Sequence, residues 1–246
     1  MFQHAIQITS GAVIGIWSSM DLSSVKLRNI PFDGAVFSRS LLQNSNFAGC
    51  NLQKISFVNA VIKDSDFSGC NLENASFCSA ILVNVDLTGA KLCDVDFSFA
   101  NIQYCHWNGY VFSNCNFTHA EFHHCTLTNT QYPQTELEGA SFYESPLDHT
   151  VFNKSLGLKQ TAFSDCSLVG TDFTKALLIY VCFRNCDLTG SFFNEARLGN
   201  VAFCGGTLKH IDFEHVAFAA TDLTQLDVSC NLSHMKFLPL ERFSPP

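Results

Sequence analysis

The stretch from Leu22 to Phe152 carries a large apolar residue at every fifth position, without a miss. These positions, which we call centres, are Leu22, Leu27, Phe32, Phe37, Leu42, Phe47, Leu52, Phe57, Ile62, Phe67, Leu72, Phe77, Leu82, Leu87, Leu92, Phe97, Ile102, Trp107, Phe112, Phe117, Phe122, Leu127, Tyr132, Leu137, Phe142, Leu147 and Phe152. An α-helix repeats its apolar residues about every 3.6 positions and a flat strand about every second position. A period of five therefore indicates a chain that turns a corner every five residues.

The residues around the centres follow the same period. Two positions before a centre the side chain is usually small or compact, as in Ala35 and Cys50, and two positions after it come Gly49, Asn59 and Asp64. Glycine, asparagine and aspartate accept turn and left-handed backbone conformations readily, so we expect a corner after each centre. Alternation along each short segment then turns the centre and the small residue inward.

Four such segments close a square coil of 20 residues, and successive coils stack through backbone hydrogen bonds. Residues 20 apart should then lie above one another. The sequence fits this arrangement, because phenylalanine recurs at positions 37, 57, 77, 97 and 117 and glycine at 49, 69, 89 and 109. The pattern predicts an all-β fold, a quadrilateral parallel β-helix of about ten coils.

The register divides the chain into three parts. Residues 1–20 precede it and are expected to form an N-terminal cap, with a targeting tail as the alternative. Residues 21–230 form the repeat, in which six residues rather than five separate Phe152 from Leu158. This slip predicts a one-residue bulge near 153–157. Residues 231–246 depart from the pattern and are interpreted as a C-terminal cap or a dimerisation tail.

Composition excludes several classes of function. The formal net charge of -8 argues against direct contact with nucleic acid or an anionic membrane, because both need a basic surface. No apolar run is long enough to span a bilayer, and no basic residue precedes the short apolar run near the N-terminus, so a secretory signal is not expected. A reducing, cytoplasmic location is the better expectation for the 12 cysteines.

The sequence contains no convincing catalytic or metal-binding motif. Seven cysteines occupy the inward position two before a centre, where a free thiol acts as a small apolar group: Cys50, Cys70, Cys105, Cys115, Cys125, Cys166 and Cys186. The histidines His106, His119, His123, His124 and His149 are expected to point outward around different sides of the rod. We therefore predict no metal site and no cofactor. No nucleophile elbow or phosphate-binding glycine loop is present, so an enzyme is not expected.

The repeat resembles the pentapeptide repeat family in segments such as Cys50-Asn51-Leu52-Gln53-Lys54, Cys70-Asn71-Leu72-Glu73-Asn74, Thr171-Asp172-Phe173-Thr174-Lys175 and Cys186-Asp187-Leu188-Thr189-Gly190. This resemblance covers about residues 20–230. It implies a right-handed quadrilateral β-helix and no common catalytic activity. Some relatives are the Qnr and mycobacterial-type quinolone-resistance proteins, rod-shaped dimers that imitate DNA and bind DNA gyrase or topoisomerase IV. Others are translocated bacterial effectors.

The outer surface is then the remaining source of function. A DNA mimic should present acidic rows, and the candidates for such a surface are Asp66, Asp86, Asp94 and Asp96. Exposed apolar patches mark interfaces, and the candidates expected to face solvent are Phe99, Tyr104, Leu177, Ile179, Tyr180 and Phe192.

Two functions follow from these surfaces. The first, suggested by the resemblance, is a non-enzymatic rod that mimics DNA, binds a type II topoisomerase and protects it from a quinolone or a toxin. The alternative is an effector or scaffold that binds a host or cellular protein through its surface and termini. Homodimerisation through one terminus is an expectation under either hypothesis.

Overall fold

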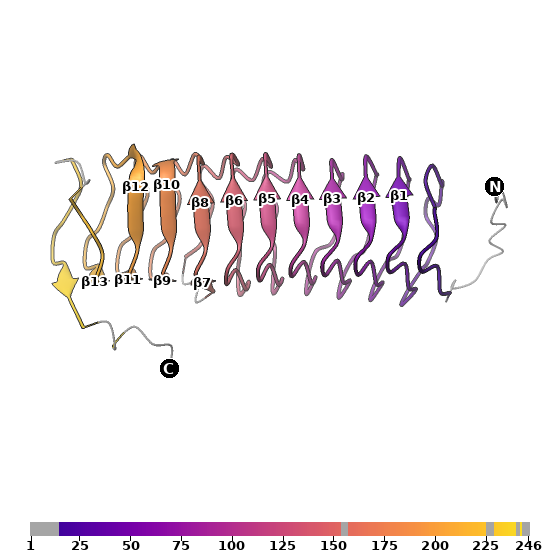
Figure 1. Cartoon of the computed structure of the whole chain (residues 1–246), viewed down its shortest axis with the longest axis horizontal. Coiled ribbons are helices and arrows are strands. Elements are labelled where there is room, and N and C mark those ends of the chain that lie inside the picture. Colours follow the sequence, from indigo (N-terminus) through magenta and orange to yellow (C-terminus); the bar gives the residue numbers. More distant parts are fainter. Residues whose placement is uncertain (1–14, 154–156, 225–228, 240–241, 243–246) are drawn as a thin grey trace.

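The computed structural model describes residues 15–153, 157–224, 229–239 and 242. In this part of the chain the fold is all-β, a parallel β-solenoid of about ten turns, which confirms the fold class predicted from the five-residue period (Figure 1). The N-terminal and C-terminal coils lie at opposite ends of a straight rod (Figure 1).

Two parallel sheets run along the rod. The nine-stranded sheet consists of β1 (Leu41–Gln43), β2 (Val61–Lys63), β3 (Ile81–Val83), β4 (Asn101–Gln103), β5 (Glu121–His123), β6 (Ser141–Tyr143), β8 (Ala162–Ser164), β10 (Cys182–Asp187) and β12 (Ala202–Thr207). The five-stranded sheet consists of β7 (Leu158–Lys159), β9 (Leu177–Ile179), β11 (Arg197–Gly199), β13 (Ala217–Ala219) and β14 (Lys236–Phe237). On the remaining sides, single-residue bridges such as Asn51↔Asn71 join the coils.

The strand register reproduces the expected coil length. Leu42 pairs with Ile62 and Phe122 with Phe142, an interval of 20 residues. The interval becomes 21 where Phe142 pairs with Phe163, and it returns to 20 where Leu158 pairs with Leu178. The extra residue therefore falls between Val151, which bridges Asp172 at an interval of 21, and Leu158. Residues 154–156 of the predicted bulge lie outside the described residues, and strand pairing continues on both sides of them.

The corners explain which residues follow the centres. Asn44, Asp64 and Asn84 have φ angles of 52°, 50° and 51°, in the left-handed region that asparagine and aspartate tolerate best. The aspartate or asparagine before a centre has a local role too: the Asp66 carboxylate accepts a hydrogen bond from the backbone amide of Ser68 at 2.9 Å. The motif thus secures each turn through its own side chains.

Aromatic centres stack in columns inside the rod. In the first half, the column of Phe37, Phe57, Phe77, Phe97 and Phe117 has ring centroids 4.9 to 5.5 Å apart. In the second half the two adjoining sides carry aromatic columns. One consists of Phe122, Phe142, Phe163, Phe183 and Phe203, and the other of Phe112, Tyr132, Phe152, Phe173, Phe193 and Phe213. The change occurs in one coil whose four successive centres are all aromatic and fully buried: Trp107, Phe112, Phe117 and Phe122.

The solenoid extends beyond both predicted limits. Ile16 bridges Val36, and the Trp17 ring stacks on Phe37 at 6.0 Å, so coil structure begins before residue 21. The part of the predicted cap in residues 1–14 lies outside the described residues. At the other end Asn231 bridges Asp212 and β14 pairs with β13, so part of the predicted tail forms the last coil.

Candidate functional site

Exposed and half-buried ring side chains gather on the outward side of β4, β5 and β6 and on the two corners beside these strands. We call this surface the histidine–aromatic face; it comprises Phe99, Tyr104, His119, His123, His124 and Tyr143. The buried centres Ile102, Phe122 and Phe142 anchor the three strands, and alternation turns the residues next to them outward. The corner residues follow two positions after a centre.

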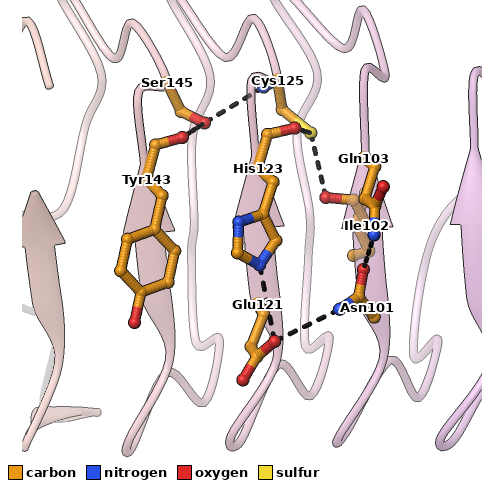
Figure 2. Close-up of polar contacts among 8 residues, drawn as sticks. All are labelled: Asn101, Ile102, Gln103, Glu121, His123, Cys125, Tyr143 and Ser145. Atoms are coloured by element: carbon orange, nitrogen blue, oxygen red, sulfur yellow. Dashed lines mark hydrogen bonds and ion pairs between the residues drawn. The ribbon is translucent and has the colours of Figure 1, made fainter. Parts of the chain in front are cut away.

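A chain of polar contacts crosses this surface (Figure 2). The Gln103 amide donates to the Asn101 side-chain oxygen at 2.6 Å, and the Asn101 amide donates to the Glu121 carboxylate at 3.2 Å. The Nε2 atom of His123 lies 3.4 Å from the same Glu121 oxygen. The Glu121 carboxylate thus joins two neighbouring strands and orients the His123 ring.

Three pairs of rings lie on or beside this polar chain, two of them stacked and one tilted. His123 stacks on Tyr143 with centroids 4.8 Å apart and Tyr104 on His124 at 5.0 Å, both with nearly parallel planes, while Phe99 lies 5.1 Å from His119. The members of each pair lie 20 residues apart, on successive coils, so ring faces meet along the rod. Ring edges and polar atoms therefore face solvent.

Four of these rings lie at left-handed corners, and two of the four are bulky aromatic residues. Phe99 and Tyr104 have φ angles of 57° and 54°, and their residues are 58% and 51% exposed. The preceding coil places the smaller Ser79 and Asn84 at the equivalent corners. A bulky residue in the left-handed region is strained, and neither ring gains full burial in return. Large rings that pack on a histidine and still stay half exposed at left-handed corners point to a role at the surface.

The residues behind the face serve packing. The adjacent Cys125 thiol and burial raise the pKa of Cys105 well above its ordinary value, and the Cys125 thiol donates to the Ile102 carbonyl at 3.4 Å. All seven inward cysteines are buried, as their sequence positions predicted. Throughout the described ranges, no group of three or more histidine, cysteine, aspartate or glutamate side chains could hold a metal ion.

The predicted apolar surface is only partly correct. Phe99 and Tyr104 lie together on the histidine–aromatic face, flanking β4. Tyr180 and Phe192 are also exposed but lie on coils farther along the rod. Leu177 and Ile179, expected to face solvent, are instead 6% and 7% exposed. They point outward from β9 and form a small apolar cluster with Ala219, against which Ala217 and Leu238 pack. The C-terminal segment thus lies over this side of the rod.

The histidines also depart from expectation. Five histidines were expected on different sides of the rod. Three of them, His119, His123 and His124, share one surface with their aromatic partners, whereas His106 lies apart from them at the cleft described below. A detectable signal was present, because a histidine and an aromatic residue recur exactly one coil length apart in each pair. Reading the outward positions at an interval of 20 would have found the site.

The predicted acidic residues form two separate groups. Asp66 and Asp86 bridge each other, whereas Asp96 bridges Ser76 and Asn116 in a different row, close to Asp94 in sequence. The Asp86 carboxylate accepts from the Thr88 amide at 2.8 Å and the Asp96 carboxylate from the Ser98 amide at 3.0 Å. These carboxylates secure local turns and do not merge into one acidic row.

A second irregularity lies next to this region. No backbone hydrogen bond joins residues 86–92 to residues 106–112, all of which the structure describes. Beneath this pair of segments, Asp66↔Asp86 and Asn71↔Lys91 are bridged; above it, His106↔Thr126 and Val111↔Gln131 are bridged. We call the unpaired interval the open junction. A cleft of about 710 Å³ opens there, lined in part by Glu73, Lys91, His106, Asn108 and Tyr110.

Two bulky residues account for the open junction. The Trp107 indole donates to the Val85 carbonyl at 3.2 Å, replacing the bond that a backbone amide makes elsewhere in the ladder. Tyr110 stands where neighbouring coils place Ala90 and Thr130 and is only half-buried. Burial raises the pKa of Tyr110, and hydrogen bonding to the Thr88 hydroxyl and the Gly89 backbone works against that rise. The two rings therefore separate the coils and satisfy part of the backbone themselves.

In the part of the chain that the structure describes, no helix has the length and apolarity needed to cross a membrane. No curated protein matches the sequence.

Several solved structures resemble the chain. HetL, a pentapeptide repeat protein involved in heterocyst differentiation regulation in Nostoc sp. strain PCC 7120, is 18% identical, with 91% of each chain covered and a TM-score of 0.44. QnrB1, a plasmid-mediated fluoroquinolone resistance protein, is 18% identical over 93% of this chain and 94% of its own, with a TM-score of 0.33. A pentapeptide repeat protein of the Arabidopsis thaliana thylakoid lumen is 22% identical over 52% and 69%, with a TM-score of 0.24.

Two family models match most of the solenoid. The model for a pentapeptide repeat region matches residues 20–97 and 115–193, and the model for eight copies of the repeat matches residues 96–131. Neither indicates an enzymatic family. The inward centres, left-handed corners and 20-residue coils are the structural form of that repeat, and the chain belongs to the pentapeptide repeat family.

Proposed function

We propose that this chain is a non-enzymatic protein-binding rod, a scaffold or effector, that binds a cellular or host protein through the histidine–aromatic face. The observation that carries the proposal is the pair Phe99 and Tyr104, two exposed rings held at strained corners on either side of one strand. Aromatic residues are enriched at the cores of protein interfaces because they bury a large area for few rotatable bonds.

Rigidity supports the same proposal. β4, β5 and β6 are hydrogen-bonded to strands on both sides, so the rings project from a backbone that loses little freedom on binding. The polar chain from Gln103 to Glu121 supplies donors and acceptors between the rings. A protein partner fits the net charge of -8 better than a nucleic acid or an anionic membrane does.

The test compares the wild type and two variants in affinity capture from cells of the source organism or its host. Phe99→Ser combined with Tyr104→Asn installs the residue types of the preceding coil at both corners. Tyr180→Ser is the matched control, because Tyr180 is an exposed ring with φ 57° on a distant coil. We expect a partner retained by the wild type and by the control and reduced at least about tenfold by the double variant. Equal recovery with all three proteins would refute the proposal.

A second candidate function is DNA mimicry toward a type II topoisomerase. It is favoured by the net charge and by the stacked carboxylates of Asp66 and Asp86 on one side of the first coils. Gyrase supercoiling with and without a quinolone, titrated with this protein, tests it. We expect altered supercoiling or drug sensitivity that weakens in Asp66→Asn combined with Asp86→Asn. No effect at micromolar protein would eliminate this function and leave the first proposal standing.

A further inference from the structure

The open junction leaves main-chain groups unpaired on both of its edges. On one edge, the Ala90 carbonyl and the Leu92 amide make no hydrogen bond within the described part of the chain. On the facing edge, the amide and the carbonyl of Val111 are likewise unpaired among the described residues. Main-chain amides and carbonyls are strong hydrogen-bonding groups, so a group without a partner in the protein must bind water or a ligand. The junction therefore offers two donors and two acceptors to a ligand.

These groups have the spacing of the edge of a parallel strand. At the preceding junction the Lys91 amide donates to the Cys70 carbonyl at 2.9 Å, and the Leu72 amide donates to the Lys91 carbonyl at 3.0 Å. The Ala90 carbonyl and the Leu92 amide are the equivalent acceptor and donor one coil farther on. One residue of an extended peptide can therefore donate to Ala90 and accept from Leu92, just as Lys91 pairs with the coil before it.

The lining of the cleft favours an uncharged peptide over an ion. The cleft volume of about 710 Å³ lies within the range of small-ligand pockets, roughly 300–1,000 Å³. The half-buried Tyr110 ring and the Val111 side chain, whose residue is 47% exposed, give the cleft an apolar wall. The two lining residues with a formal charge, Lys91 and Glu73, have opposite signs, so the lining selects neither an anion nor a cation.

We propose that the open junction binds the main chain of a short, extended, uncharged peptide segment. The segment pairs with the edge at Ala90 and Leu92 as an added strand, and an aliphatic side chain of the segment packs on Tyr110 and Val111. Main-chain hydrogen bonds supply the affinity in this mode of recognition, and the wall that receives the side chain supplies the specificity. The cleft shares no lining residue with the histidine–aromatic face, so each of the two sites can fail its test alone.

The test titrates the full chain, labelled with nitrogen-15, with acetyl-Thr-Val-Thr-amide, an uncharged tripeptide of strand-forming residues. We expect saturable shifts of the Leu92 and Val111 amide signals, with a dissociation constant in the millimolar range that suits so small a ligand. The matched probe carries a methyl group on its valine nitrogen, so it keeps every side chain but loses the donor to Ala90. The affinity for the methylated probe should be at least about tenfold lower.

Two variants locate the site on the protein, with circular dichroism as the check that each one folds. Trp107→Leu with Tyr110→Thr should close the junction and abolish probe binding. Phe99→Ser with Tyr104→Asn leaves the cleft lining intact and should bind the probe like the wild type, which separates this site from the proposed function. Absence of saturable shifts in the wild type, equal affinity for the two probes, or the same shifts with sodium phosphate and not with the tripeptide would overturn the proposal.

Discussion

Two adjacent junctions between coils show how far the repeat tolerates a bulky side chain. At the junction between residues 66–72 and 86–92, which we call the closed junction, both single-residue bridges form and backbone amides such as Phe67 and Gly69 donate to the next coil at 2.8 Å. One coil farther on, at the open junction, none of these bonds forms. Equivalent backbone segments are thus hydrogen-bonded to the next coil at the closed junction and not at the open junction, and two side chains differ between them.

Side-chain volume is the cause of the difference. The closed junction has Leu87 at its upper centre and Ala90 at the inward position before the next centre, whereas the open junction has Trp107 and Tyr110 there. An interior packed at crystal-like density cannot absorb two added rings at one corner. The coils separate, and the rings' own polar atoms replace part of the lost backbone bonding. At the open junction the repeat therefore loses backbone hydrogen bonds between coils while it buries the Trp107 ring.

The largest difference in stability is expected between two variants that each introduce a carboxylate, one in the buried core and one at the open junction. Phe97→Asp puts a carboxylate into a fully buried stacked column beside bridges that are intact, and we expect a loss of more than about 5 kcal/mol and no native circular dichroism. Val111→Asp puts the same group on the exposed rim of the open junction, where 47% of the residue is accessible, and should cost less than about 1 kcal/mol. Similar melting temperatures for the two variants would contradict the expected difference between the buried column and the rim of the open junction.

A matched pair of truncations tests the packing on each side. Leu72→Ala and Leu92→Ala remove equivalent centres one coil apart, and both leucines are buried. We expect Leu72→Ala to cost about 4 kcal/mol, because it leaves a closed cavity, and Leu92→Ala about 2 kcal/mol, because the neighbouring cleft lets water or side chains fill the space. Urea unfolding measures both values. A larger loss for Leu92→Ala would show that the cleft is closed in solution.

Replacing the two rings should close the open junction. Trp107→Leu with Tyr110→Thr installs residue types found at the same positions of neighbouring coils, namely Leu127 and Thr130. The amides of Leu92 and Val111 should then pair with the opposite coil, and each bond is worth about 1 kcal/mol net. Hydrogen exchange at these two amides should slow by about tenfold or more.

The reverse change provides the control for this experiment. Thr130→Tyr introduces a ring at a fully buried position of a bridged junction, and overpacking there should cost about 1–3 kcal/mol. Exchange should accelerate at the amide of Gln131, which bonds to the Tyr110 carbonyl at 2.8 Å. Unchanged exchange in both variants would mean that ring volume does not control the junction.

The smallest expected effect concerns two buried thiols. Burial raises the pKa of both Cys70 and Cys115 to about 12, and each donates to a backbone carbonyl, Cys70 to Phe47 and Cys115 to Leu92. Their thiolate fractions are thus similar, so a difference in alkylation rate reports local opening. Cys115, which is bonded to the rim of the open junction, should react several-fold faster by peptide mass mapping. Equal rates would mean that the two junctions open equally often.

The raised pKa values of the same two thiols also predict how the stability of the fold changes at alkaline pH. A thiol pKa raised in the folded state stabilises that state below the ordinary value of about 9, and the contribution is lost as pH rises through about 12. Stability should therefore fall between about pH 9 and pH 12. Cys70→Ala combined with Cys115→Ala should flatten this fall, whatever its cost at neutral pH.

The predicted fold was correct because its signal is repeated along the whole chain. A single centre says little, but many centres at one interval leave one geometry that buries them all. The open junction was missed although Trp107 and Tyr110 are visible in the sequence, because a large residue at a small position does not reveal whether it enters the core or forces the coils apart. The shared surface of His119, His123 and His124 is not evident along the chain, because its ring pairs are neighbours only across successive coils.

By itself, the sequence determined the five-residue corner, the 20-residue coil and the inward set of leucines, phenylalanines and cysteines, since these depend on local alternation and on repetition. Only the tertiary structure decided which outward residues meet and which become covered. Leu177 and Ile179 follow the outward pattern yet are buried, because Leu238, some 60 residues later in the chain, packs against their cluster. Periodicity sets the direction in which a side chain points, but its burial depends on which other segments of the chain pack on that side.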